Sequence, residues 1–173
     1  YGAQVISDIW KETNGNAIVV SDVGQHQMLE AQYYKHDEPN TLLTSGGLGT
    51  MGFSLPAAIG ASFVDRGKDI WVIVGDGSIQ MTITELATAV QENANIKIAI
   101  INNGYLGMVR QWQQLFYDSR YNETPISSPD YVKLSEAYGL KGYRVTSRRE
   151  IPNIIKEAQK ENGPVLIEFV VEQ

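Results

Sequence analysis

The hydrophobic residues of this chain gather in short runs that are separated by longer, more polar stretches. Most runs are nearly continuous in Val, Ile and Leu and do not alternate between polar and apolar positions. Such runs are typical of strands buried on both faces, as in parallel sheets. They are Ala17–Ser21, Asn40–Thr44, Ile70–Gly75, Ile96–Ile101 and Val165–Val171, with Gly142–Val145 as a weaker sixth run.

Between these runs, apolar residues recur at helical spacing. Residues 83–90 place four apolar side chains on one helical face, and Thr82 with Glu85 has the sequence of a capping box before it. The other predicted helices are Gln4–Glu12, Ser54–Val64, Leu106–Phe116, Pro129–Tyr138 and Ile151–Ala158. Alternating strands and helices predict a doubly wound α/β fold, with a mainly parallel six-stranded sheet and helices on both faces. The polar stretch Asp118–Asp130 is predicted to be a surface loop.

Length and charge narrow the class of protein. The 173 residues have the length of one domain, and 14 Lys and Arg against 20 Asp and Glu give a formal net charge of -6. That charge argues against sequence-independent binding of nucleic acid. The chain has no Cys, which excludes disulfides and thiol nucleophiles, and no apolar run approaches the roughly 18 residues of a membrane span. Because the first residue is Tyr1, we expect residues 1–173 to be a single domain of a longer, multidomain protein.

Glycine and polar residues follow four of the predicted strands. In a parallel sheet the carboxyl ends of the strands meet at one edge, where ligands bind. We therefore expect these four segments to form one site. They are Asp22–Gln27, Ser45–Gly52, Asp76–Ser78 and Asn102–Tyr105.

One of these segments contains the pattern G-x-G-x-x-G, formed by Gly47, Gly49 and Gly52. It follows a predicted strand and precedes a helix, so a nucleotide-binding module is one alternative for this chain. Two details weigh against it. Residues 53–56 delay the helix after the glycines, and Asp76 at the end of the next strand is followed by a second glycine turn.

The turns at Asp76 and Asn103 offer oxygen ligands and backbone N–H groups that suit a metal ion and a phosphate. Residues 78–101 separate them, which is enough for one helix and one strand, so the turns should be neighbours. Mg²⁺ prefers about six oxygen ligands, and Asp76, Asn103 and a carbonyl of the turn that ends at Tyr105 offer three. The backbone N–H groups of Gly77 and Ser78 would face phosphate oxygens. The alternative is two ordinary turns, with Asp76 as a helix cap.

These two turns resemble the G-D-G to N-N motif of thiamine-diphosphate enzymes. Three other segments, Val23–Met28, Thr44–Gly52 and Leu106–Gln113, are similar to the catalytic subunit of acetolactate synthase (acetohydroxyacid synthase). The resemblance covers essentially the whole chain and corresponds to the C-terminal diphosphate-binding domain of that family. It implies the thiamine-diphosphate-binding fold.

The resemblance also implies a reaction and its cofactors. The family is a group of transferases that condense two pyruvates, or pyruvate and 2-oxobutyrate, to 2-acetohydroxy acids with loss of CO₂. This step begins the biosynthesis of the branched-chain amino acids isoleucine and valine. Thiamine diphosphate carries the chemistry, Mg²⁺ holds its diphosphate, and FAD is expected on a domain outside this chain.

Site residues follow from the resemblance. Asp76, Asn103 and the backbone carbonyl of Tyr105 would bind Mg²⁺, whereas Gly49 and Met51 would meet the aminopyrimidine through backbone atoms. The substrate-side candidates are Met108, Val109 and Trp112. The full set expected to bind the cofactor is Val23, Gly24, Gln25, His26, Gly49, Met51, Gly75, Asp76, Gly77, Ser78, Asn103 and Tyr105.

Taken without the resemblance, some of these residues have ordinary interpretations. His26 is then a polar turn residue, Met108 is a packing residue, and Trp112 belongs to a core or an interface. The chain as a whole keeps two alternatives besides the nucleotide-binding module. One is another thiamine-diphosphate-dependent 2-oxo acid decarboxylase or carboligase, and the other is a non-catalytic interaction domain.

The family activates its cofactor with a glutamate that belongs to the N-terminal domain of a neighbouring subunit. Glu85 and Glu92 lie in a different context, so no catalytic residue of this kind is expected here and the 173 residues alone should be inactive. We also expect the C-terminal tail that caps the site in the family to lie outside residues 1–173. The whole enzyme is expected to be a homo-oligomer with a possible regulatory subunit. It should be cytoplasmic, or plastid if it comes from a plant.

Overall fold

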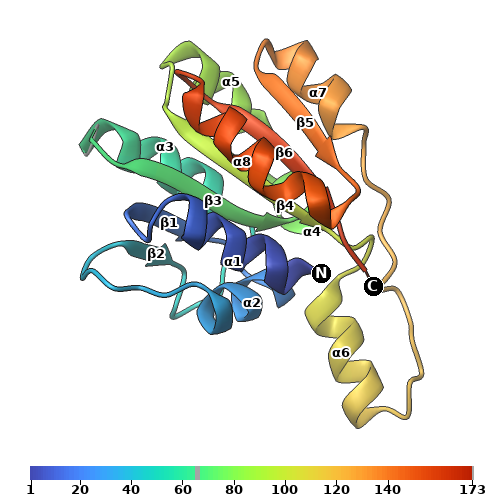
Figure 1. Ribbon diagram of the computed structural model, residues 1–173. Coiled ribbons are helices and arrows are strands. Elements are labelled where there is room, and N and C mark those ends of the chain that lie inside the picture. Colours follow the sequence, from blue (N-terminus) through green and yellow to red (C-terminus); the bar gives the residue numbers. More distant parts are fainter. Residues whose placement is uncertain (65–66, 173) are drawn as a thin grey trace.

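The sheet of this protein has six parallel strands in a computed structural model that describes residues 1–64 and 67–172 (Figure 1). Their spatial order is β2-β1-β3-β4-β6-β5, and every pair is parallel. The strands are β1 (Ala17–Ser21), β2 (Leu42–Thr44), β3 (Asp69–Gly75), β4 (Ile96–Asn102), β5 (Lys141–Val145) and β6 (Val165–Val170). All six predicted runs form strands, which confirms the predicted α/β fold class.

Helices cover both faces of the sheet, as predicted. One face packs against α3, α4, α5 and α7, and the other packs against α1, α2 and α8. The α-helices are α1 (Gly2–Glu12), α2 (Gln25–Tyr33), α3 (Ser54–Val64), α4 (Asp76–Thr82), α5 (Leu86–Gln91), α6 (Gly107–Phe116), α7 (Tyr131–Tyr138) and α8 (Ile151–Lys160). Two short 3₁₀ helices, η1 (Ile83–Glu85) and η2 (Arg148–Glu150), precede α5 and α8.

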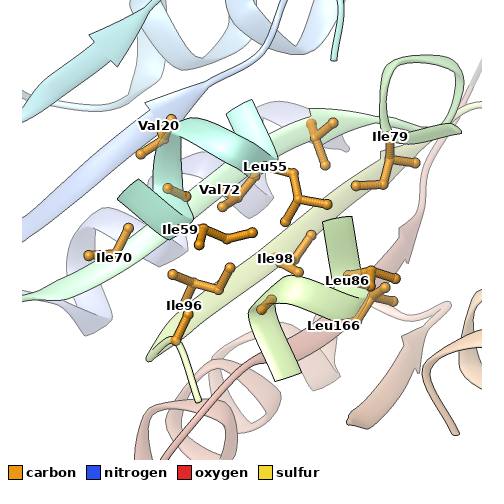
Figure 2. Close-up of a cluster of buried hydrophobic side chains, with 14 of the residues drawn as sticks. Val20, Leu55, Ile59, Ile70, Val72, Ile79, Leu86, Ile96, Ile98 and Leu166 are labelled. Atoms are coloured by element: carbon orange, nitrogen blue, oxygen red, sulfur yellow. The ribbon is translucent and has the colours of Figure 1, made fainter. Parts of the chain in front are cut away.

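Strand β3 shows how the core is divided between the two faces. Val72 and Val74 point into the cluster under α3 and α5, whereas Trp71 and Ile73 point into the cluster under α1 and α8. All four side chains are completely buried. Figure 2 shows the first cluster, in which Leu55 and Ile59 of α3 lie over the strands. Burial of each aliphatic side chain stabilises the folded state by about 1.5–3 kcal/mol. A strand that is covered on both faces therefore gains stability from apolar residues at successive positions.

Two local predictions are wrong. Thr82 occupies the N-cap position of η1, but its side chain forms no capping hydrogen bond, because its hydroxyl donates to the Gly52 carbonyl at 3.0 Å. Helix α7 begins at Tyr131 and not at Pro129, because the carboxylate of Asp130 accepts a hydrogen bond from Lys133 N and caps it.

Helix α2 was not predicted at all. It buries only His26 and Glu30, so its sequence lacks the apolar face from which a helix is recognised.

Helix α6 projects beyond the carboxyl ends of the strands, away from the sheet (Figure 1). None of its residues is fully buried. The segment from Asp118 to Asp130 that returns from it is irregular apart from a single bridge between Tyr105 and Pro125, as predicted. Within the described ranges, no helix is both long and apolar enough to cross a bilayer.

Candidate cofactor site

A cavity of about 520 Å³ lies at the carboxyl ends of β1, β3 and β4. The turns after these strands line it, together with the first turn of α6. Of the candidate residues, Gly49 and Trp112 lie outside the lining, and the Trp112 side chain is exposed farther along α6. The candidates that line the cavity are Val23, Gly24, Gln25, His26, Met51, Gly75, Asp76, Gly77, Ser78, Asn103, Tyr105, Met108 and Val109.

The turns at Asp76 and Asn103 meet at this cavity. Strands β3 and β4 pair side by side, with Gly75 opposite Ile101. The backbone N–H of Gly104 donates to Asp76 Oδ2 at 3.0 Å across the two turns. The prediction that these turns are neighbours at one edge of the sheet is therefore confirmed.

Asp76 is a buried carboxylate, with 2% of its surface exposed. Its side chain accepts hydrogen bonds from Gly104 N and, at 3.4 Å, from the Ser128 hydroxyl, and no ion pair among the described residues includes it. Burial raises its pKa to about 6, although these hydrogen bonds act in the opposite direction. Asp76 does not cap α4, because Gly75 occupies the N-cap position. A cation beside the carboxylate would offset the cost of its desolvation.

Asn103 keeps part of its hydrogen-bonding capacity free. Its Oδ1 accepts from Tyr105 N at 3.0 Å, and its Nδ2 donates to Gln25 Oε1 at 3.0 Å. Since an amide oxygen has two lone pairs, one remains available on Oδ1. The bond to Gln25 ties the start of α2 to the same turn. The Ser78 hydroxyl donates to the Val23 carbonyl at 3.1 Å and ties the start of α4 to the turn between β1 and α2.

The start of α2 has the features of an anion site. Gly24 is its N-cap, with a φ of 148°, and no side chain caps the helix. His26 in the first turn is 6% exposed, and its Nε2 atom has no hydrogen-bond partner within the described part of the chain. Burial lowers the pKa of His26 to about 4, with Asp22 opposing the shift, so the imidazole is neutral at pH 7. Free N–H groups beside an unpartnered imidazole nitrogen suit phosphate oxygens.

Asp22 is a site residue whose role sequence reasoning missed. It is completely buried, and its carboxylate accepts from Val23 N at 2.8 Å, Gly52 N at 2.9 Å and Ser54 N at 2.8 Å. It thereby holds the glycine segment before α3 against the end of β1. A carboxylate at the N-terminus of α3 occupies the place that a dinucleotide pyrophosphate would need, which argues against the nucleotide-binding alternative.

Two further residues were missed. The hydroxyl of Tyr131, on α7, donates to the Asp76 carbonyl at 2.8 Å, and no pattern in the sequence signals this contact. At Gly107 a Cβ atom would lie 2.5 Å from Gln25 Oε1 and 2.7 Å from Asn103 Nδ2, so a larger residue there would displace these amides. The sequence signal for this role of Gly107 was its position two residues after the turn that ends at Tyr105.

Comparison with known proteins identifies the class of this site. The chain belongs to the thiamine pyrophosphate enzymes, since residues 22–169 match the family described as "Thiamine pyrophosphate enzyme, C-terminal TPP binding domain". Both turns and the start of α2 lie within the matched residues.

Relatives of the chain include acetolactate synthases of bacteria and yeasts. It is 47% identical over 173 residues to the acetolactate synthase of Mycobacterium leprae and 49% identical over 173 residues to the acetolactate synthase large subunit of Corynebacterium glutamicum. It is 48% identical over 168 residues to the mitochondrial acetolactate synthase catalytic subunit of Saccharomyces cerevisiae. The matches cover 96%, 96% and 97% of this chain and 28%, 28% and 24% of these relatives. The resemblance inferred from the sequence is confirmed, and the chain spans about a quarter of the length of these relatives.

Proposed function

We propose that this chain is the cofactor-binding domain of an acetolactate synthase. The enzyme would condense two pyruvates, or pyruvate and 2-oxobutyrate, to a 2-acetohydroxy acid and CO₂. The names of the relatives support this substrate class. The observation that carries the proposal for this chain is the hydrogen bond from Gly104 N to Asp76 Oδ2, which joins the two turns beside the cavity.

The residues present fit Mg²⁺ and a diphosphate. Asp76 provides a buried carboxylate with no cationic partner among the described residues, and Asn103 Oδ1 keeps a free lone pair. With the carbonyl of Tyr105, these groups would supply three oxygens to the cation, and phosphate and water would complete its coordination. His26 Nε2 and the N–H groups at the start of α2, with those of Gly77 and Ser78, would bind the diphosphate oxygens.

When bound, thiamine diphosphate supplies the electron sink for the decarboxylation of a 2-oxo acid. The chain's own residues position it and shape the surrounding cavity. Met51 lines the cavity next to the glycine segment that Asp22 holds, on the side proposed for the aminopyrimidine. Met108 and Val109 provide apolar surface at the start of α6 that would exclude water from the substrate side.

The activity of the whole enzyme is part of the proposal, because the relatives are about four times as long as this chain. We place the activating glutamate and FAD on other domains, and we propose a homo-oligomer. The large-subunit names of some relatives support a regulatory subunit as a partner. Bacterial relatives favour a cytoplasmic location.

A product assay tests the proposal. The full-length protein with pyruvate, thiamine diphosphate and Mg²⁺ should release acetolactate and CO₂ in equal amounts. Asp76→Asn should lower the turnover by at least about 100-fold at ordinary cofactor concentrations, because it removes the charged ligand. Asp118→Asn, in the exposed loop, is the matched control and should retain the activity. Release of acetaldehyde without acetolactate would assign the chain to a decarboxylase instead.

A further inference from the structure

A row of polar side chains connects the turn at Asn103 to the edge of the sheet formed by β5. Asn102 is the last residue of β4, Glu168 lies on β6, Arg144 lies on β5, and Asp130 caps α7. Asn102 Nδ2 donates to Glu168 Oε1 at 2.7 Å, and Arg144 Nε donates to Glu168 Oε2 at 2.6 Å. Arg144 Nη2 also donates to Asp130 Oδ1 at 2.8 Å. These contacts join three adjacent strands and the start of a helix.

Glu168 is the buried centre of this row, with 3% of its surface exposed. A buried carboxylate is costly unless each of its oxygens has a donor. Arg144 lies opposite Glu168 in the pairing of β5 and β6, where it supplies both a charge and a hydrogen bond. Glu168 and Arg144 do not line the cavity. Their direct contact with the turn at Asn103 is the hydrogen bond between Asn102 and Glu168.

Glu168 determines which way the Asn102 amide is turned. A carboxylate only accepts hydrogen bonds, so it takes the NH₂ group of Asn102 and leaves the amide oxygen facing the other way. That oxygen accepts from Gly104 N at 3.1 Å, and the same N–H lies 3.0 Å from Asp76 Oδ2. Gly104 has a φ of 71°, in the left-handed region. The N–H of Gly104 thus faces two acceptors, Asp76 Oδ2 and Asn102 Oδ1, and Glu168 fixes the orientation of the second.

We propose that Glu168, held by Arg144, is a positioning residue for the cation site of the proposed function, on which this inference rests. Gly104 lies between the two proposed ligands of the second turn, Asn103 and the carbonyl of Tyr105. By fixing the Asn102 amide, Glu168 holds Gly104 in the conformation that presents both ligands to the same side as Asp76. Loss of the carboxylate should loosen the turn without removing any ligand.

The substitution Glu168→Gln tests this in the full-length protein. A glutamine has nearly the same shape, but it offers its own NH₂ group and no longer selects the orientation of Asn102. The apparent dissociation constant for Mg²⁺, measured by calorimetry at a fixed concentration of thiamine diphosphate, should rise by about tenfold. Without any cation, the Gly104 amide should exchange its hydrogen faster. The control Lys141→Gln removes the exposed ion pair between Lys141, on β5, and Glu161, at the end of α8, and should change neither measurement.

A double-mutant cycle separates positioning from a general loss of stability. Asn102→Ser should weaken Mg²⁺ binding to a similar extent, and the double variant should be no weaker than the weaker single variant, because both act through one amide. Fully additive losses would overturn the inference. So would an unchanged Mg²⁺ affinity and Gly104 exchange rate in Glu168→Gln.

The thermal midpoint is measured for every variant, and a loss of Mg²⁺ affinity that only follows a lower midpoint would also overturn the inference. The variant Asp76→Asn distinguishes a failure of this inference from a failure of the proposed function. If Asp76→Asn loses Mg²⁺ binding and Glu168→Gln does not, the inference alone fails. If the wild-type protein binds thiamine diphosphate equally well without Mg²⁺, both fail.

Discussion

His26 is a neutral imidazole in the folded protein, because burial lowers its pKa to about 4 from an ordinary value of 6.5. The unfolded chain therefore binds a proton more tightly than the folded one between these two values. The stability contributed by neutral His26 is fully present above pH 6.5 and is lost as the pH falls towards 4. Folding and the charge state of this cavity residue are thus coupled in mildly acidic solution.

The expected size of this effect is about 2 kcal/mol at pH 5 relative to pH 7 in the absence of cofactor. Urea unfolding at the two pH values measures it. In His26→Gln, which keeps a polar side chain but cannot be protonated in this range, the acid-induced loss should be smaller by about that amount. An identical pH dependence in the two proteins would show that His26 does not titrate as its burial implies.

Some site residues were predictable one by one, and others were not. Asp76 and Asn103 stand directly after apolar runs, so a strand-end argument finds them and places them together. The role of Asp22 depends on N–H groups at Gly52 and Ser54, which lie 30 and 32 residues away along the chain. Backbone donors leave no mark in the sequence. The same is true of the Tyr131 hydroxyl, which reaches the Asp76 carbonyl from 55 residues away.

At the level of elements, the first turn of α6 is packed against the amides of the site. A Cβ atom at Gly107 would overlap the ends of the Gln25 and Asn103 side chains. Gly107→Ala should therefore break the hydrogen bond between these amides and weaken Mg²⁺-dependent cofactor binding by about tenfold. Calorimetry on the full-length protein measures the loss.

Gly60→Ala is the matched control for this prediction. Gly60 lies within α3, and nothing stands within 4 Å of a Cβ atom at that position. Alanine there should stabilise the protein by about 0.5–1 kcal/mol through its higher helix propensity and leave cofactor binding unchanged. Cofactor affinity that stayed normal in Gly107→Ala would mean that the contact between Gln25 and Asn103 is dispensable.

Strands were easier to predict than helices for a physical reason. The four central strands, β1, β3, β4 and β6, are buried along most of their length, and most of their residues are apolar, so the runs are conspicuous. Helices α2 and α4 owe their positions to the turns of the site more than to an apolar face. Helix α2 buries only two residues, and both of them, His26 and Glu30, are polar. Periodicity therefore could not detect it.

For the whole molecule, an acidic chain is proposed to bind a strongly acidic ligand. The formal net charge of -6 predicts no affinity for a diphosphate. The affinity has to come from local features: a cation bridging Asp76, Asn103 and the ligand, together with uncapped N–H groups and a buried imidazole. The net charge of the chain therefore does not predict its ligand. The groups at the carboxyl ends of the strands determine it.

The direct test of this arrangement is a calorimetric titration of the full-length protein with thiamine diphosphate, once with Mg²⁺ and once with a chelator in its place. Binding through a cation held by the turns at Asp76 and Asn103 predicts a saturable heat with Mg²⁺ and at least about 100-fold weaker binding without it. Equal affinity under the two conditions would contradict the account.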